Sequence, residues 1–185
     1  GVRGSPAACL HPSRPTPVNV RAIAANRRLG TTEAARRLVA FLVTPKLDPA
    51  LRVEALYSLE SWPDASTLDP MDGRHFPVSQ GDPDALGEVV GPEVWSLAND
   101  SNDKVSRRVI ALLRKIEPSS VQLDRVVGYV LDEKQRSPVR IEWLRWLRKW
   151  KIDLFSSVGV QALASKSVEL RVVASQELIG AKRGR

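Results

Sequence analysis

Apolar residues recur along this chain with the spacing of one buried helical face. In the segment 120–132 they stand at Leu123, Val126, Val127, Val130 and Leu131. This i, i+3, i+4, i+7, i+8 order is typical of an amphipathic α-helix. Four such helices are predicted, over residues 32–43, 86–98, 120–132 and 153–164.

A second set of predicted helices opens with a repeated motif, which we call the arginine motif: apolar, Arg, apolar, any residue, small or apolar. Its arginines are Arg21, Arg52, Arg140 and Arg171, and a degenerate copy has Ser106 at that position. The first two and the last two arginines are each 31 residues apart. Asp, Ser or Pro often precedes the motif, as at a helix N-terminus. Two helices per period predict an all-α fold, a right-handed α-solenoid of HEAT-like helix pairs.

Proline and glycine mark the boundaries of the predicted domains. Residues 1–17 hold four of the 13 prolines, so we interpret them as a disordered or linker segment. The HEAT-like repeat domain is predicted over 18–180, with a loop insertion at about 61–84, and 181–185 form a basic tail. The count is a half repeat at 18–29 and four helix pairs. An unpaired first helix predicts a piece of a longer protein, and a capping helix is the alternative.

The net charge of +7 raises nucleic acid, acidic lipid and acidic protein as partners. Glu and Asp lie among the helical arginines, which argues against nucleic acid. The segment 139–150 combines Trp143, Trp146 and Trp150 with Arg and Lys, a combination that can bind a single strand. The helical spacing of the tryptophans instead predicts a core stripe, and a protein-binding face is the next choice.

Residue types for catalysis or metal binding are sparse. Cys9 is the only cysteine, so Cys9-Leu10-His11 lacks the second cysteine of a haem-attachment motif, and His75 has no ligand at zinc-site spacing. Asp69 and Asp72 lack the other acids of a calcium loop. Phosphate-loop, hydrolase-elbow and metalloprotease motifs are absent from the sequence. We therefore predict no enzyme activity, no cofactor and no small-molecule substrate for this chain, and the lack of a long apolar run predicts no membrane span.

The run from Leu51 to Pro63, followed by Leu68-Asp69 and the segment from Asp72 to Pro77, resembles the helical part of haem-binding, membrane-bound dehydrogenase-like proteins of planctomycetes and verrucomicrobia. In that family a β-propeller precedes HEAT repeats, and a cytochrome c-like domain with a C-x-x-C-H motif follows them. The resemblance implies an exported parent oxidoreductase, a periplasmic location and a spacer role for this segment. Otherwise a cytoplasmic location is expected. The chain contains neither the propeller nor the haem motif, so no catalytic or haem residue is assigned here.

These observations favour a non-catalytic scaffold that contacts another protein or an adjoining domain. The expected contact residues are exposed cations on the motif helices: Arg107, Arg108, Arg145 and Lys149. One alternative is the spacer of a larger haem-dependent, sugar-dehydrogenase-like oxidoreductase. Another is nucleic-acid binding by a basic face, which predicts an affinity for duplex DNA that falls steeply with salt.

Overall fold

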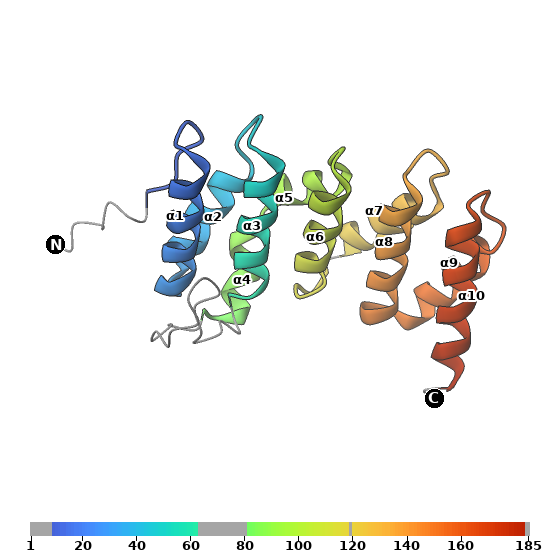
Figure 1. Cartoon of the computed structure of the whole chain (residues 1–185). Helices are drawn as coiled ribbons and strands as arrows, with labels where there is room; N and C mark the ends of the chain where they lie inside the picture. Colours follow the sequence, from blue (N-terminus) through green and yellow to red (C-terminus); the bar gives the residue numbers. More distant parts are fainter. Residues whose placement is uncertain (1–8, 63–80, 119, 184–185) are drawn as a thin grey trace. The chain divides into compact units, whose positions relative to one another are not determined.

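The computed structural model describes residues 9–62, 81–118 and 120–183, and these residues form ten α-helices, one short 3₁₀ helix and no strand (Figure 1). The all-α prediction is confirmed. The helices are α1 (Thr16–Leu29), α2 (Thr32–Leu42), α3 (Pro49–Glu60), α4 (Pro83–Val89), α5 (Pro92–Ser96), η2 (Leu97–Asn99), α6 (Asp103–Leu113), α7 (Ser120–Leu131), α8 (Ser137–Trp150), α9 (Ile152–Ala162) and α10 (Val168–Arg183).

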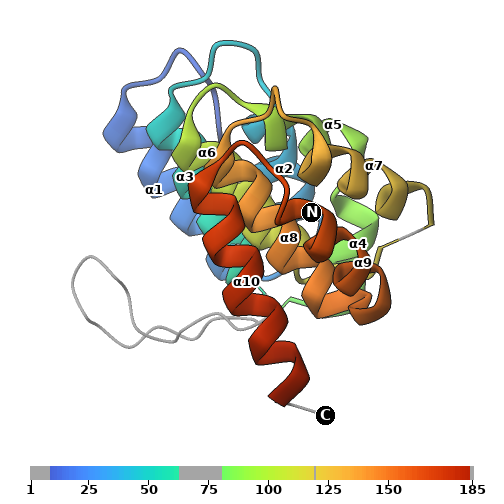
Figure 2. The ribbon, with the colours of Figure 1, turned by 90° about the vertical axis from the view of Figure 1, so that its right-hand side faces the viewer.

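The chain divides into two compact units, one that ends at Leu112 and one that begins at Leu113. In the first unit, α1 packs against α3, and α2 packs against both. In the second unit, α8 packs against α10, and α9 packs against both and also against α7. Figure 2 shows two layers within each unit, with α1, α3 and α6 or α8 and α10 in one layer and the intervening helices in the other. The motif helices thus share a layer within their own unit.

Local side-chain chemistry accounts for the helix starts. The Thr31 hydroxyl accepts a hydrogen bond from the Ala34 amide at 3.2 Å, and the Asp48 carboxylate accepts one from the Ala50 amide at 2.8 Å. These bonds satisfy amides that lack a partner in the first helical turn. After α1, Gly30 has φ 61°, a left-handed conformation that glycine adopts without a Cβ penalty and that ends the helix.

Several of the apolar positions on which the helical prediction rests lie in the core. Val126 and Val130 of α7 are fully buried, as are Trp143 and Trp146 of α8. The Trp146 ring also donates from Nε1 to the Leu113 carbonyl at 3.1 Å, so its one polar group is satisfied inside the core. Trp150 is half-buried. The predicted tryptophan core stripe is thus confirmed at two positions and partly confirmed at the third.

The arginine motif makes the same kind of contact in three of its copies. In each, the guanidinium donates to a main-chain carbonyl at or just beyond the end of the preceding helix, where carbonyls lack a helical partner. The pairs are Arg52 with Thr44 at 3.0 Å, Arg140 with Val130 at 2.8 Å and Arg171 with Ser165 at 2.7 Å. The motif residue therefore joins the start of its helix to the end of the helix before it.

The other two copies differ. Arg21 in α1 is exposed. Ser106, at the degenerate position, is buried and donates to the Asp103 carbonyl at 3.2 Å within its own turn. Ahead of this copy, Asp100 accepts from Arg52 at 2.7 Å. The loop before α6 thereby remains linked to the preceding motif arginine, although it has no arginine of its own.

The helix predicted over 86–98 is wrong as a single element, because α4 ends at Val89 and α5 begins at Pro92. Gly91 is extended, with φ −80° and ψ −179°. Proline disfavours a helical conformation at the residue before it and has no amide to donate. The dipeptide Gly91-Pro92 in the sequence therefore indicates a break between two helices.

Three predicted boundaries shift slightly in the structure. Helix α1 begins at Thr16, inside the predicted linker, and α10 continues to Arg183, inside the predicted basic tail. Residues 63–80 of the predicted insertion lie outside the described residues, and α4 begins at Pro83, before the predicted end of the insertion. The two flanks of that segment meet, because the Gly81 amide donates to the Trp62 carbonyl at 3.2 Å. A Cβ at Gly81 would lie 2.2 Å from the buried Trp62 ring, so only glycine fits there.

Candidate functional site

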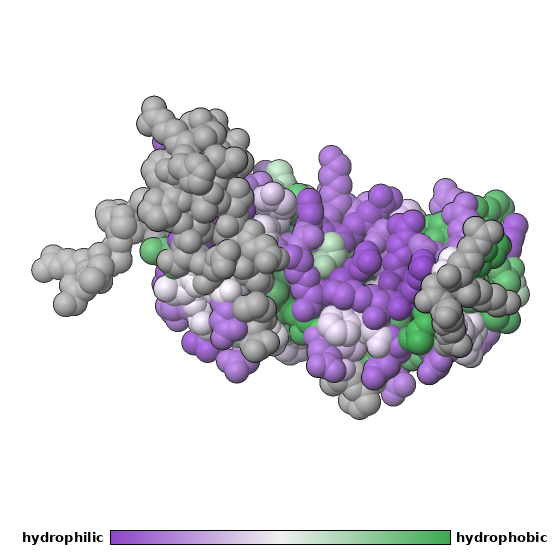
Figure 3. Space-filling view, turned by 90° about the horizontal axis from the view of Figure 1, so that it is seen from below, coloured by the Kyte–Doolittle hydropathy of each residue, from purple (hydrophilic) through white to green (hydrophobic). Residues whose placement is uncertain are grey.

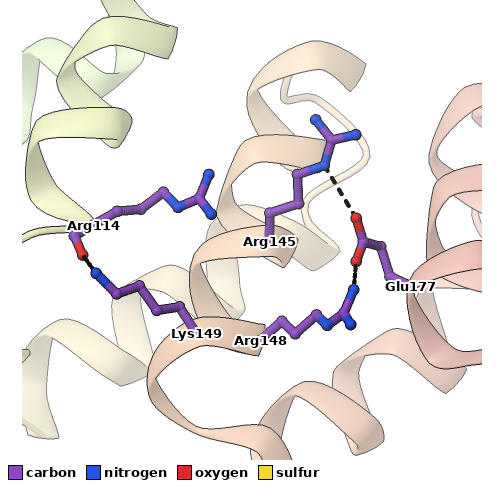
Figure 4. Close-up of a pocket in the computed structure, with 5 residues that line it drawn as sticks. All are labelled: Arg114, Arg145, Arg148, Lys149 and Glu177. Carbon is purple, nitrogen blue, oxygen red and sulfur yellow. Dashed lines mark hydrogen bonds and ion pairs between the residues drawn. The ribbon is translucent and has the colours of Figure 1, made fainter. Parts of the chain in front are cut away.

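Four cationic side chains and one carboxylate line an open hollow of about 490 Å³ in the second unit, which we call the basic hollow. Its lining residues are Arg114, Arg145, Arg148, Lys149 and Glu177 (Figure 4). Arg114 follows the end of α6, the next three lie on the last turns of α8, and Glu177 lies on α10. Figure 3 looks along the helices from the end at which α8 finishes and shows hydrophilic residues over much of that face.

Helical geometry explains why α8 supplies three of these cations. Arg145, Arg148 and Lys149 are spaced i, i+3, i+4, so they share the face opposite to the buried stripe of Trp143 and Trp146. On α10, Gly180 lets Arg148 lie close, since a Cβ there would be 3.3 Å from Arg148 Nη2. The backbone of α10 and the polar edge of α8 therefore approach each other at this point.

Glu177 is held between two arginines. Arg145 Nε lies 3.3 Å from Glu177 Oε1, and Arg148 Nη1 pairs with Glu177 Oε2. The carboxylate is 18% exposed, whereas the two arginines are 40% and 38% exposed. Both oxygens of one internal carboxylate thus have a guanidinium partner, and each arginine side chain remains partly exposed to solvent.

On the other side of the hollow, the positive charges of Lys149 and Arg114 have fewer carboxylates near them. Lys149 donates from Nζ to the Arg114 carbonyl at 2.5 Å and lies 4.8 Å from the centre of the Trp150 ring. No carboxylate lies within ion-pair distance of this ammonium group among the residues that the structure describes. Arg114 is 4.0 Å from Glu142, which Arg145 also contacts at 3.0 Å.

Crowding of like charges shifts the titration of Lys149. Partial burial lowers the pKa of this ammonium below its ordinary value of 10.5, and the neighbouring charges of Arg114 and Lys115 lower it further. Each of these causes disfavours the protonated form. A bound anion would relieve the repulsion, so the hollow has the electrostatics of a site for negative charge.

Two of the four predicted contact residues, Arg145 and Lys149, meet in this hollow, while Arg107 and Arg108 belong to the first unit. Arg107 is exposed. Arg108 pairs with Glu60 at 2.7 Å, and its guanidinium lies 5.3 Å from the centre of the Tyr57 ring. Arg108 therefore serves packing between α6 and α3 as well as the surface of its unit.

The predicted contact residues did not include Arg114, Arg148 or Glu177. Arg148 follows Arg145 by three residues on one helix, and this spacing was a usable signal. Nothing local connects Arg114 or Glu177 to α8, because they lie 35 residues before Lys149 and 32 residues after Arg145.

The tryptophans of α8 do not form a stacking platform for nucleic-acid bases. Trp143 and Trp146 are fully buried, and Lys149 covers part of the Trp150 ring. Binding of a single strand by stacking needs exposed aromatic faces.

The described residues contain no group of three or more His, Cys, Asp or Glu side chains placed to hold a metal ion, and Cys9 is exposed with a free thiol. In the same part of the chain, no helix combines the length and the apolar character needed to cross a membrane.

The chain matches no protein-family model, no curated protein and no solved structure. Within the segment that carries the family resemblance, Leu51, Ala55, Leu56, Leu59 and Trp62 are buried in the core of the first unit. Residues 68–77 lie outside the described residues.

Proposed function

We propose that this chain is a non-catalytic helical-repeat scaffold, a right-handed solenoid of HEAT-like helix pairs that holds another protein or an adjoining domain. The observation that carries the proposal is the shared role of the motif arginine. Arg52, Arg140 and Arg171 each bind the carbonyl end of the preceding helix. A contact that recurs in this way is expected in a repeat protein, in which successive helix pairs have the same structure.

The packing order supports the same proposal. Two pairs of neighbouring motif helices pack on each other, α1 on α3 in the first unit and α8 on α10 in the second, and in each case the intervening helix packs against both. Contacts that reach only the adjacent elements are the hallmark of repeat proteins.

A selection with purified components tests this function. The chain would be immobilised and used to select binders from a displayed library of peptide and domain fragments, and each enriched binder would be titrated against the free chain by calorimetry. We expect a saturable complex of defined stoichiometry at physiological ionic strength. Variants that reverse exposed charges on the motif helices, such as Arg107→Glu, would be compared with Arg125→Glu on α7 as a matched control.

Two results would contradict the scaffold proposal. One is a selection that returns no saturable binder. The other is duplex DNA that outcompetes every selected binder at physiological ionic strength, which would favour a nucleic-acid function instead.

A further inference from the structure

We propose that the basic hollow binds a carboxylate-rich peptide segment, and that Glu177 occupies part of this site when the chain is free. The inference rests on the scaffold function and adds the place and the chemical class of the partner. Clusters of arginine are a known mode of acidic-motif recognition, because the guanidinium group matches a carboxylate in shape and charge.

The first step is the charge of the hollow. Its lining holds four cations, Arg114, Arg145, Arg148 and Lys149, against the single carboxylate of Glu177. Glu142 lies beside the lining and pairs with Arg145 and, at 4.0 Å, with Arg114. The positive charge therefore exceeds the negative charge even when both glutamates are counted.

The second step is the carboxylate that is already in place. Glu177 receives Arg145 on one oxygen and Arg148 on the other. The two guanidinium groups thus already stand at a spacing that suits a carboxylate. A glutamate of a partner can either replace Glu177 there or bind beside it at Lys149, whose ammonium contacts the Arg114 carbonyl and the Trp150 ring.

The third step separates a peptide from the other anionic partners. The two acidic side chains at the hollow, Glu142 and Glu177, lie among the cations and interrupt the continuous positive surface that a phosphate backbone favours. The buried Trp143 and Trp146 give bases nothing to stack on. The described residues that line the hollow are all charged, so a drug-like ligand with an apolar body does not fit either.

The test is a binding titration of the full chain with a short, fluorescein-labelled, glutamate-rich peptide, followed by anisotropy at low and at physiological ionic strength. Lys149→Gln should weaken binding by about threefold, as expected for an exposed charge pair. Glu177→Gln should strengthen binding by about threefold, because it removes the carboxylate that Arg145 and Arg148 both contact, although Arg145 keeps its pair with Glu142.

Two matched control variants distinguish peptide binding at the basic hollow from attraction by the net charge of the protein. Lys134→Gln removes an exposed lysine of the same unit, and Glu169→Gln removes an exposed carboxylate of the same helix as Glu177. Both should leave the affinity nearly unchanged. Circular dichroism would verify that every variant is folded, and Lys149→Gln keeps the test decisive if Glu177→Gln unfolds, because Lys149 takes part in no ion pair among the described residues.

Three results would overturn the inference. The peptide does not bind at low ionic strength, or Glu177→Gln and Glu169→Gln strengthen binding equally, or single-stranded DNA of equal charge binds more tightly and responds to the same variants. The selection described above can also return a binder whose affinity is the same for the parent chain, Lys149→Gln and Glu177→Gln. That result would contradict peptide binding at the basic hollow but would agree with the scaffold function.

Discussion

Arg140 donates from Nη2 to the Glu133 carboxylate at 2.9 Å, across the loop that joins α7 to α8. Its Nε donates to the Val130 carbonyl at 2.8 Å. From the loop before α10, the Ser165 hydroxyl donates to the same Glu133 oxygen at 2.8 Å. One arginine and one glutamate thus connect the end of α7, the start of α8 and the loop that leads into α10.

Replacing this arginine should destabilise the second unit markedly. Arg140 is 2% exposed, and Arg140→Met would leave the Val130 carbonyl without its buried donor and Glu133 without its charge partner. We expect the free energy of unfolding to fall by about 2 kcal/mol. Urea unfolding followed by circular dichroism measures this. Arg125→Met, at an exposed position of α7, is the control and should cost less than about 0.5 kcal/mol.

The same ion pair predicts an acid-sensitive fold. The hydrogen bond from Arg140, aided by the one from Ser165, lowers the pKa of Glu133 from 4.5 to about 2. Between these two values the unfolded chain binds a proton that the folded chain does not bind, so acid favours unfolding there. The stabilisation by Glu133 is therefore complete above pH 4.5 and is lost as the pH falls toward about 2.

The variant Glu133→Gln checks this pH dependence. Unfolding in urea at a series of pH values should show the variant to be less stable than the parent chain near neutral pH. The two stabilities should converge as the pH approaches about 2. A difference that stays constant over the whole range would show that Glu133 does not titrate as described.

The titration of Lys149 should respond to its neighbours in the basic hollow. Burial comes first and Arg114 second among the causes that lower the pKa of Lys149. Arg114→Gln should therefore raise this pKa part of the way toward 10.5, because the burial remains. Nuclear magnetic resonance of the lysine side chain measures the shift, with Lys134 of the same protein as the internal control. An unchanged pKa would contradict the geometry of the hollow.

Gly128 offers a way to stabilise the second unit. It lies inside α7, is exposed, and a Cβ there would meet no other atom within 4 Å. Gly128→Ala should raise the free energy of unfolding by about 0.5–1 kcal/mol, since alanine loses less backbone entropy on folding. Thermal unfolding compares it with Gly159→Ala in α9, where the Cβ would lie 3.1 Å from Leu178 Cδ2. We expect a smaller gain or a loss for the second variant, because Leu178 must move.

Much of the fold could be predicted from the chain alone. The apolar spacing in α7 and α8 and the capping residues Thr31 and Asp48 act within a few residues of one another, and two intervals of the arginine motif are equal at 31 residues. The prediction failed at 86–98, where helical apolar spacing competes with Gly91-Pro92. There the backbone restriction from proline outweighs the periodic pattern.

By itself, the sequence determined which segments form helices and which of their faces are buried, because helical propensity, capping and hydrophobic period are local properties. Only the tertiary structure decided that Arg114, the cations of α8 and Glu177 line one hollow. It also decided that the motif arginines bind the carbonyl ends of preceding helices. Those contacts join separate helices, and the distance between two helices depends on how their side chains interdigitate rather than on the spacing within either one.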